Sequence, residues 1–261
     1  TGPPSSPRRG SRPLASCRSG GCSVADQLPG KPLGIKAYGS IGHLPNSRLG
    51  PSDSSVPEGQ AAICCARVRD KHDVVIVQEK LDGSCVAVAR IGDQLHALGR
   101  AGWPAQSSPH RQHQLFAYWV RLNAHRFLST LEDGERIVGE WLAQAHGTRY
   151  DVAEAGGEPF GAFDIMQGQA RLPYRDFEAR VGGVFATPHL LSYGPPVSVA
   201  DAVRMHQANR WPSPDGIEGV VYRVERKGKV EFLAKYVLPD KVDGRYFPEI
   251  SGQPEVWNWQ P

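Results

Sequence analysis

The chain has 261 residues, a hydrophobic content of 40%, a charged content of 22% and a formal net charge of +3 at pH 7. This balance is typical of a globular protein with room for one large domain or two small ones. No stretch approaches the roughly 18 consecutive apolar residues that a membrane span requires. The small net charge does not by itself indicate a nucleic-acid partner, although it permits a local basic groove.

The N-terminal region differs in composition from the rest of the chain. Residues 1–32 are rich in Pro, Ser, Gly and Arg, and the first acidic residue is Asp26. This composition predicts a disordered or low-complexity tail. An organelle transit peptide is the alternative, but the segment has no amphipathic periodicity and contains several prolines. We therefore expect a folded domain over residues 33–247 and a short tail at 248–261.

The five cysteines do not have the spacing of a metal site. Cys64 and Cys65 are adjacent, Cys17 and Cys22 lie in the N-terminal region, and a second close pair is missing. A zinc site usually needs two close ligand pairs, so the pattern favours reduced thiols. Reduced thiols and the absence of a membrane span predict a cytoplasmic protein.

The first half of the domain reads as loops followed by strands. Residues 36–57 contain turn signals and precede runs rich in β-branched residues. An apolar run at 74–77, an alternating run at 83–90 and a third run at 94–98 predict three strands, with a turn at Gly92-Asp93 between the last two. Residues 36–57 are expected either to cap a pocket or to form a structural wrap.

The second half of the domain combines strands with helices. Residues 111–130 have helical spacing, with one buried stripe formed by Leu115, Trp119, Leu122 and Phe127. We expect His110, His113 and His125 on the helix surface. A helix is predicted at 198–210, with Ser198 as its N-cap and Pro212 just past its end. Further strands are predicted at 135–143, 160–166, 217–225 and 230–237. The pattern predicts an α+β fold with several antiparallel strands and outer helices.

One short segment carries a pattern of reactive groups. Lys80 ends an apolar strand and is followed by Leu81-Asp82-Gly83. Taken alone, this could be a surface lysine before a hairpin turn, because Asp-Gly is a favoured turn pair. Four other segments lie on predicted strands further along the chain: Gly139-Glu140-Trp141, Phe163-Asp164-Ile165, Glu218-Gly219-Val220-Val221 and Lys235 within FLAKYV.

In this order the segments resemble the motifs of the covalent nucleotidyltransferase superfamily, which contains ATP-dependent DNA ligases, RNA ligases and mRNA capping enzymes. KLDG resembles the nucleophile motif KxDG, and Arg100 resembles the motif arginine that follows it. The resemblance covers residues 36–247 and depends on order and spacing, because each motif is short. It implies a nucleotide-grasp nucleotidyltransferase (adenylation) domain built on antiparallel sheets with peripheral helices, and a pocket between two sheets.

The chemistry of the residues is consistent with this resemblance. Transfer of a nucleotide to Lys80 requires a neutral amine, whereas an ordinary lysine has a pKa near 10.4. A bound metal or Lys235 is expected to lower that pKa. Magnesium prefers oxygen ligands and keeps several waters, so one or two carboxylates suffice. Glu140 and Glu218 are the candidates for binding Mg²⁺ or Mn²⁺, with solvated strand-end glutamates as the alternative.

The resemblance implies further roles in binding ATP. Asp82 would orient the nucleophile region, although it could be a simple turn residue. Arg100 would hold the ribose, and Phe163 would stack on the purine unless it is only a core aromatic. Glu79 would read the adenine amino group, which favours ATP over GTP. Lys235 would contact the α-phosphate.

The sequence departs from the family pattern in two places, and these departures bear on which enzyme class of the superfamily it resembles. RNA ligases often have two lysines spaced by one residue in the last motif, but here Leu233 takes the first place. About 25 residues follow Lys235, too few for the oligonucleotide-binding-fold domain of DNA ligases and capping enzymes.

The sequence therefore favours an ATP-dependent RNA ligase with a nucleic-acid substrate. It would join 5′-phosphate and 3′-hydroxyl ends, as in RNA repair, through a lysyl-AMP intermediate. A minimal DNA ligase, a capping-type guanylyltransferase and a nucleic-acid-binding module with a decayed active site are the alternatives. The sequence does not indicate the oligomeric state.

Overall fold

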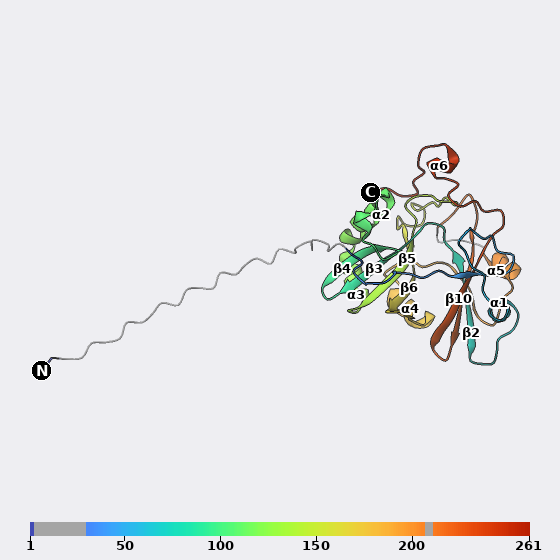
Figure 1. The fold of residues 1–261 in the computed structure, drawn as a ribbon, viewed down its shortest axis with the longest axis horizontal. Helices are drawn as coiled ribbons and strands as arrows, with labels where there is room; N and C mark the ends of the chain where they lie inside the picture. The colour runs from blue at the N-terminus through green and yellow to red at the C-terminus, as the bar shows by residue number, and fades with distance from the viewer. Residues whose placement is uncertain (3–29, 207–210) are drawn as a thin grey trace.

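Two five-stranded β-sheets form the body of the protein in a computed structural model that describes residues 1–2, 30–206 and 211–261 (Figure 1). All strand pairs are antiparallel except β1 with β10. The first sheet has the order β1 (Gly42–His43), β10 (Lys229–Val237), β9 (Gly219–Arg226), β2 (Asp73–Lys80) and β8 (Leu190–Gly194). The second has the order β4 (Gln94–Gly99), β3 (Ser84–Ile91), β5 (Glu135–Trp141), β6 (Phe160–Gln167) and β7 (Ala170–Arg171). The predicted α+β fold is confirmed.

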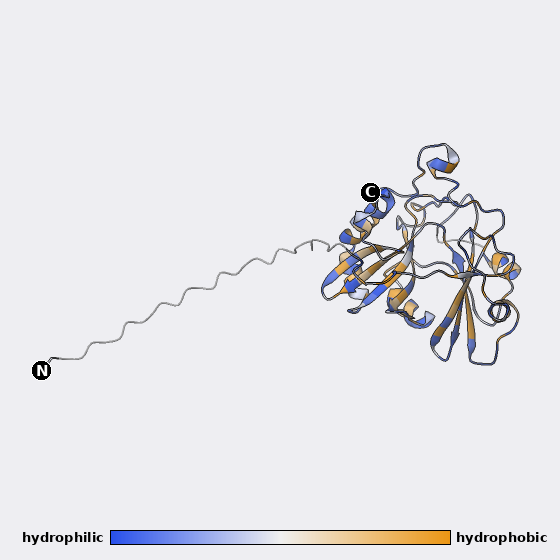
Figure 2. Ribbon diagram, viewed as in Figure 1, coloured by the Kyte–Doolittle hydropathy of each residue, from blue (hydrophilic) through white to orange (hydrophobic). Residues whose placement is uncertain are grey.

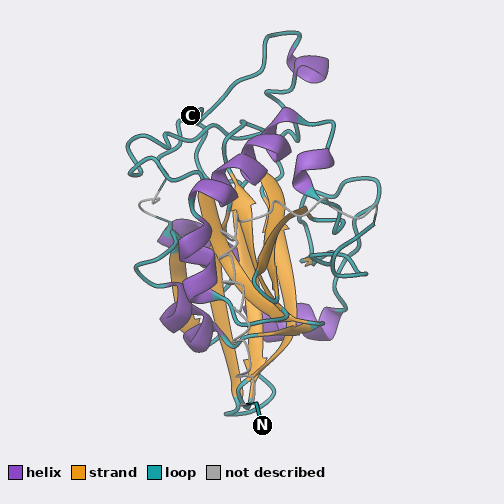
Figure 3. Cartoon of the chain, turned by 90° about the vertical axis from the view of Figure 1, so that its left-hand side faces the viewer, coloured by secondary structure: helices purple, strands orange, loops and turns teal. Residues whose placement is uncertain are grey.

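Helices lie on the outside of both sheets (Figure 3). On the first sheet, α1 (Glu58–Cys65) and α5 (Val199–Met205) both contact β9. On the second sheet, α2 (Arg111–Leu122) contacts β4, and α3 (Ala124–Thr130) contacts β3 and β4. The remaining helical segments are η1 (Ala105–Ser107), α4 (Tyr174–Val181) and α6 (Pro248–Ser251). In the described part of the chain, no helix is long and apolar enough to cross a membrane.

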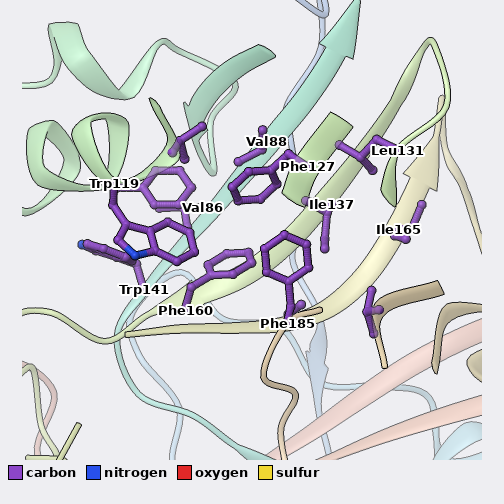
Figure 4. Close-up of a cluster of buried hydrophobic side chains, with 14 of the residues drawn as sticks. Val86, Val88, Trp119, Phe127, Leu131, Ile137, Trp141, Phe160, Ile165 and Phe185 are labelled. Atoms are coloured by element: carbon purple, nitrogen blue, oxygen red, sulfur yellow. The ribbon is translucent and has the colours of Figure 1, made fainter. Parts of the chain in front are cut away.

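The larger apolar core lies between the second sheet and helices α2 and α3 (Figure 4). The strands supply branched and aromatic side chains at alternate positions, because successive residues of a strand point to opposite faces. The helices supply Phe116, Trp119, Val120 and Phe127, all of which are buried. Figure 2 shows hydrophobic residues along the strands of both sheets. The alternation of apolar and polar residues from which these strands are predicted therefore arises because every second side chain packs in this core.

The predicted helix at 111–130 is two helices. The chain breaks at Asn123, whose φ and ψ are −106° and 17°, between α2 and α3. The buried face of α2 contains Phe116, Trp119 and Val120, whereas Leu122 is 60% exposed. The prediction that Leu122 belongs to the buried stripe is wrong. The buried face of α2 is centred on Phe116, Trp119 and Val120, and α2 ends at Leu122.

The other helix prediction is confirmed at its start. Ser198 caps α5, since its hydroxyl accepts a hydrogen bond from the Asp201 amide at 3.1 Å. The helix ends at Met205, earlier than predicted, and residues 207–210 lie outside the described residues. The predicted N-terminal tail, residues 1–32, lies almost entirely outside the described residues. Cys17 and Cys22 also lie outside them. Of the described cysteines, Cys64, Cys65 and Cys85 are free thiols.

The segment after residue 247 is tied to the body of the protein. The amide of Asn258 donates to the carbonyl of Ala143 at 2.8 Å, and its side chain donates to the carbonyl of Leu142 at 2.8 Å. Trp257 and Trp259 pack against the larger core. The segment predicted as a short tail, residues 248–261, is therefore joined by these contacts to the loop that follows β5.

Candidate active site

A pocket of about 440 Å³ opens between the two sheets. Its walls contain residues from strands far apart in the sequence, because β2, β9 and β10 belong to one sheet and β3, β5 and β6 to the other. Predicted site residues that line it are Glu79, Lys80, Arg100, Glu140, Phe163 and Lys235. Asp82 and Glu218 are not among the lining residues, but both lie near Lys80, Glu218 in an ion pair with it. The structure thus brings together all eight residues selected from the sequence.

The position of Lys80 is set by the register of the first sheet. Lys80 is the last residue of β2 and is paired with Gly219 on β9, which places Glu218 beside it. The Lys80 Nζ atom lies 2.6 Å from Glu218 Oε2, and Glu218 is buried. Gly219 cannot carry a side chain, because a Cβ atom would lie 1.9 Å from the Tyr236 carbonyl oxygen. The close approach of β10 therefore explains the glycine in Glu218-Gly219.

The Lys80 amine is surrounded by carboxylates. Burial opposes its charge, but the nearby Glu218, Glu140 and Asp82 carboxylates raise its pKa above the ordinary value. The expected lowering by Lys235 is therefore wrong for the protein alone, since the carboxylates outweigh this cation. Burial and the charge of Lys80 lower the pKa of Lys235 instead. The raised pKa favours the protonated amine, so the charge of the carboxylates must be offset before Lys80 can act as a nucleophile.

Glu140 and Glu218 have the chemistry of a hard-cation site. Burial raises the pKa of Glu140 to about 7 and that of Glu218 to about 8, although the charge of Lys80 opposes both shifts. Glu140 also accepts a hydrogen bond from the Gly83 amide at 3.1 Å. Two carboxylates fit a cation that keeps water and phosphate oxygens in its shell. No group of three or more ligand side chains occurs within residues 30–206 and 211–261.

Asp82 forms two hydrogen bonds with the loop that follows β5. Its Oδ2 atom accepts from the Gly147 amide at 2.9 Å, and its own amide donates to the Tyr150 hydroxyl at 2.9 Å. Gly83, the next residue, passes so close to Trp141 that a Cβ atom would lie 2.4 Å from its carbonyl oxygen. Asp82 and Gly83 therefore position the link between β2 and β3 rather than forming a simple surface turn.

Arg100 and Phe163 lie on the wall of the pocket. The Arg100 guanidinium donates to the Gly39 carbonyl at 3.2 Å and to the Ser40 hydroxyl at 3.0 Å. The half-buried Phe163 ring meets the Tyr38 ring edge-on, with centroids 5.3 Å apart. Because one side of Phe163 faces the pocket, it is not only a core aromatic.

Glu79 has partners on the face of the sheet opposite to Lys80. Successive strand residues alternate between faces, and Glu79 shares its face with Val75 and Val77. Its carboxylate accepts from the His189 amide at 2.9 Å and lies 3.0 Å from His206 Nε2. Burial raises its pKa to about 7. For the Glu79 carboxylate to accept a hydrogen bond from a bound base, it must share or lose its contacts with His189 and His206.

Leu233, which stands where many RNA ligases have a first motif lysine, lies beside the buried cation Arg223. Leu233 is paired with Arg223 across β9 and β10, and both line the pocket. The Arg223 guanidinium forms an ion pair with Asp164, which also accepts from the Tyr38 hydroxyl at 2.8 Å. Arg223 is not among the residues predicted from the sequence, although its alternation with Gly219 and Val221 places it on the pocket face.

Two further expectations are resolved by the pocket wall. His113 lines the pocket, so its assignment to the helix surface is wrong; its Nε2 atom lies 3.3 Å from the Ser84 hydroxyl. Segment 36–57 serves both expected purposes. Tyr38, Gly39 and Ile41 line the pocket, whereas His43 is buried 3.1 Å from Asp53. Asp53 also lies 3.6 Å from Lys235 and so links this segment to the site.

The ordered motifs, the two sheets and the shared pocket define a protein of the nucleotidyltransferase superfamily. More narrowly, the chain belongs to the RNA ligase family, whose model matches residues 73–237. This match runs from the first residue of β2 to the last residue of β10 and includes Lys80 and Lys235. A search of curated proteins gives no match.

Several solved structures are similar to this chain. An archaeal ATP-dependent RNA ligase is 23% identical over 63% of this chain and 42% of its own, with a TM-score of 0.42. A Naegleria gruberi RNA ligase variant with ATP and Mn is 17% identical over 77% and 60%, with a TM-score of 0.45. An Aquifex aeolicus putative ATP-dependent DNA ligase is 16% identical over 63% and 43%, with a TM-score of 0.41. This chain spans less than two thirds of the length of each.

Proposed function

We propose that the protein is an ATP-dependent RNA ligase that carries AMP on Lys80. The observation that carries this proposal is a lysine inside the pocket, 2.6 Å from the buried Glu218 carboxylate and near that of Glu140, within the region that matches the RNA ligase family. Related structures are described as RNA ligases, and one of them contains ATP and Mn. The lysines and carboxylates at the pocket support binding of ATP and a divalent cation here.

The reaction would proceed in three steps, each a nucleophilic attack on a phosphorus atom. The neutral Lys80 amine attacks the α-phosphorus of ATP, so that an N–P bond forms, the bond to pyrophosphate breaks and the amine proton passes to solvent. A terminal 5′-phosphate of RNA then takes AMP from Lys80, which leaves as the protonated amine. A 3′-hydroxyl finally attacks the 5′-phosphate, releases AMP and seals the strand.

The protein groups have distinct roles in this proposal. Glu140 and Glu218 would hold Mg²⁺ or Mn²⁺, which supplies positive charge beside the phosphate oxygens. A cation bound to these carboxylates removes the charges that keep Lys80 protonated. Lys235 would contact the α-phosphate, Arg100 the ribose and Phe163 the purine face. Asp82 would hold the link between β2 and β3 in place.

Intact mass spectrometry after incubation with ATP and Mg²⁺ tests the proposal directly. We expect one added AMP per chain, and peptide mapping should place it on Lys80. Sealing assays on RNA and DNA nicks then identify the polynucleotide. RNA binding without an adduct would instead support a binding module with a decayed active site, and sealing confined to DNA would support a DNA ligase.

Base choice provides a second test. Glu79 adjoins the pocket, and its carboxylate, once it leaves or shares His189 and His206, would accept a hydrogen bond from the adenine amino group, whereas guanine has a carbonyl at that place. We expect ATP to label the protein at least about tenfold better than GTP, a ratio worth about 1.4 kcal/mol. Radioactive labelling with both nucleotides measures this ratio, with Glu79→Gln as the comparison. Equal labelling by the two nucleotides would contradict the role of Glu79 and favour a capping enzyme.

The raised carboxylate pKa values predict how adduct formation depends on pH. Burial raises the pKa of Glu140 to about 7 and that of Glu218 to about 8, so the ionised fraction of both carboxylates increases between pH 6 and pH 9. The ionised carboxylates bind the cation, which offsets the charges that raise the pKa of Lys80, and a higher pH also favours the neutral amine, so the rate of adduct formation should increase from pH 6 to pH 9. Single-turnover labelling with ATP and Mg²⁺ measures the rate, and thermal melts at each pH verify folding. A rate that is highest at pH 6 would exclude this assignment.

A further inference from the structure

Two stretches of the chain contain basic residues but no acidic ones, so each has a net positive charge. Residues 30–52 contain three Lys and Arg residues, residues 94–131 contain four, and neither stretch contains Asp or Glu. Their summed formal charge is +7, compared with +3 for the whole chain, so the other 200 residues sum to −4. A polyanionic partner would be attracted to the surface that these two stretches form.

The two stretches contact each other beside the pocket. The Tyr38 amide donates to the Arg100 carbonyl at 3.2 Å, and both residues line the pocket. Gly102, in the turn after Arg100, has a φ of +89°, and a Cβ atom there would lie 2.2 Å from the Ile35 carbonyl oxygen. This glycine lets the turn pack directly on the first stretch, so the turn is fixed next to the pocket.

Trp103 lies at the end of this turn and is open to solvent. The Gly99 amide donates to the Trp103 carbonyl at 2.9 Å, which closes the turn that contains Arg100. All six tryptophans lie in the described residues, and only Trp103 is more than half exposed, at 53%. The Lys31 Nζ atom lies 5.2 Å from the centroid of its ring. An exposed ring beside a cation is the arrangement on which unpaired bases stack.

Most of the cations in the two stretches form no ion pair with a carboxylate in the described part of the chain. Arg48 and Arg126 form ion pairs with Asp243 and Glu158, at 2.6 Å and 2.7 Å. The other five cations of the two stretches form no ion pair with any residue in 30–206 or 211–261: Lys31, Lys36, Arg100, Arg111 and Arg121. Their charges are available to the phosphates of a bound strand.

We propose that Trp103, Lys31 and Lys36 bind unpaired nucleotides of the RNA strand next to its reacting end. The inference rests on the proposed function, because the strand must reach AMP in the pocket beside Arg100. Stacking on an indole tolerates any base, and the lysines neutralise phosphates. In a duplex the bases are already stacked on each other, so this surface favours single-stranded ends.

Binding measurements on the full chain test the proposal. Fluorescence anisotropy with a 3′-labelled, 5′-phosphorylated single-stranded RNA gives the Kd of wild type, Trp103→Ala and Trp103→Phe. Tyr193→Ala is the matched control, because the exposed Tyr193 also has a cation, Arg175, 4.2 Å from its ring centroid but does not line the pocket. We expect at least about fivefold weaker binding for Trp103→Ala, with most affinity kept by Trp103→Phe and all of it by Tyr193→Ala.

The same variants separate this inference from the proposed function. AMP labelling from ATP should be unchanged in Trp103→Ala, and binding of a blunt duplex should change less than twofold. Lys36→Gln should reduce the dependence of Kd on salt by about one phosphate contact. An unchanged Kd for single-stranded RNA in Trp103→Ala, or equal losses on single strand and duplex, would overturn the inference. A wild-type protein without an AMP adduct would overturn the proposed function instead.

Discussion

A Lys80→Arg protein is expected to fold and to lose the AMP adduct. Arginine keeps a positive charge beside Glu218, but its guanidinium stays protonated at any working pH and cannot attack phosphorus. Loss of a nucleophile removes several orders of magnitude in rate, and here we expect a decrease of roughly 10⁴-fold or more. Labelling with radioactive ATP measures the adduct, and thermal melts verify the fold.

A preadenylated strand separates the roles of Lys80 in the reaction. The last step does not use the amine as a nucleophile, so Lys80→Arg should retain some sealing of RNA that already carries a 5′-adenylate. Lys229→Arg, at an exposed position on β10, is the matched control and should label like wild type. A covalent AMP adduct on Lys80→Arg would show that the nucleophile lies elsewhere, and the other site assignments would fail with it.

Much of the fold follows from local patterns in the sequence. Strands β3, β4, β5 and β6 begin and end within about two residues of their predictions, because alternating branched side chains reflect the larger core. Helix α4 was missed although Tyr174, Phe177 and Val181 have helical spacing and are buried. Helix α1 gave a weaker signal, since its short sequence combines Ala, Ile and Cys without a clear polar face.

The contacts within the site could not be predicted from local patterns. Lys80 meets Glu218 only because β2 pairs with β9 in one register, and the two residues are 138 positions apart. This register depends on long-range packing, which a single sequence does not reveal. In contrast, the opposite directions of Glu79 and Lys80 follow from strand periodicity and were open to prediction. The Arg223–Asp164 ion pair required both sheets to be placed.

Replacing Glu218 with glutamine is expected to slow adduct formation by about 100-fold or more, the scale of losing one electrostatic contact to a reacting phosphate. Glutamine keeps the shape but removes the charge that raises the pKa of Lys80. If Glu218 acted only as the ion-pair partner of Lys80, its removal would release the amine and speed the reaction. A slower reaction therefore indicates that Glu218 binds the cation.

Glu135→Gln is the matched control for Glu218→Gln. Glu135 is also a buried carboxylate in an ion pair of 2.6 Å, with Arg180, but it does not line the pocket. Both variants are expected to lose some stability, because each removes the carboxylate that lies closest to a cation. Only Glu218→Gln should require more Mg²⁺ for half-maximal labelling. Near-normal labelling and an unchanged Mg²⁺ requirement in a folded Glu218→Gln protein would remove Glu218 from the metal site.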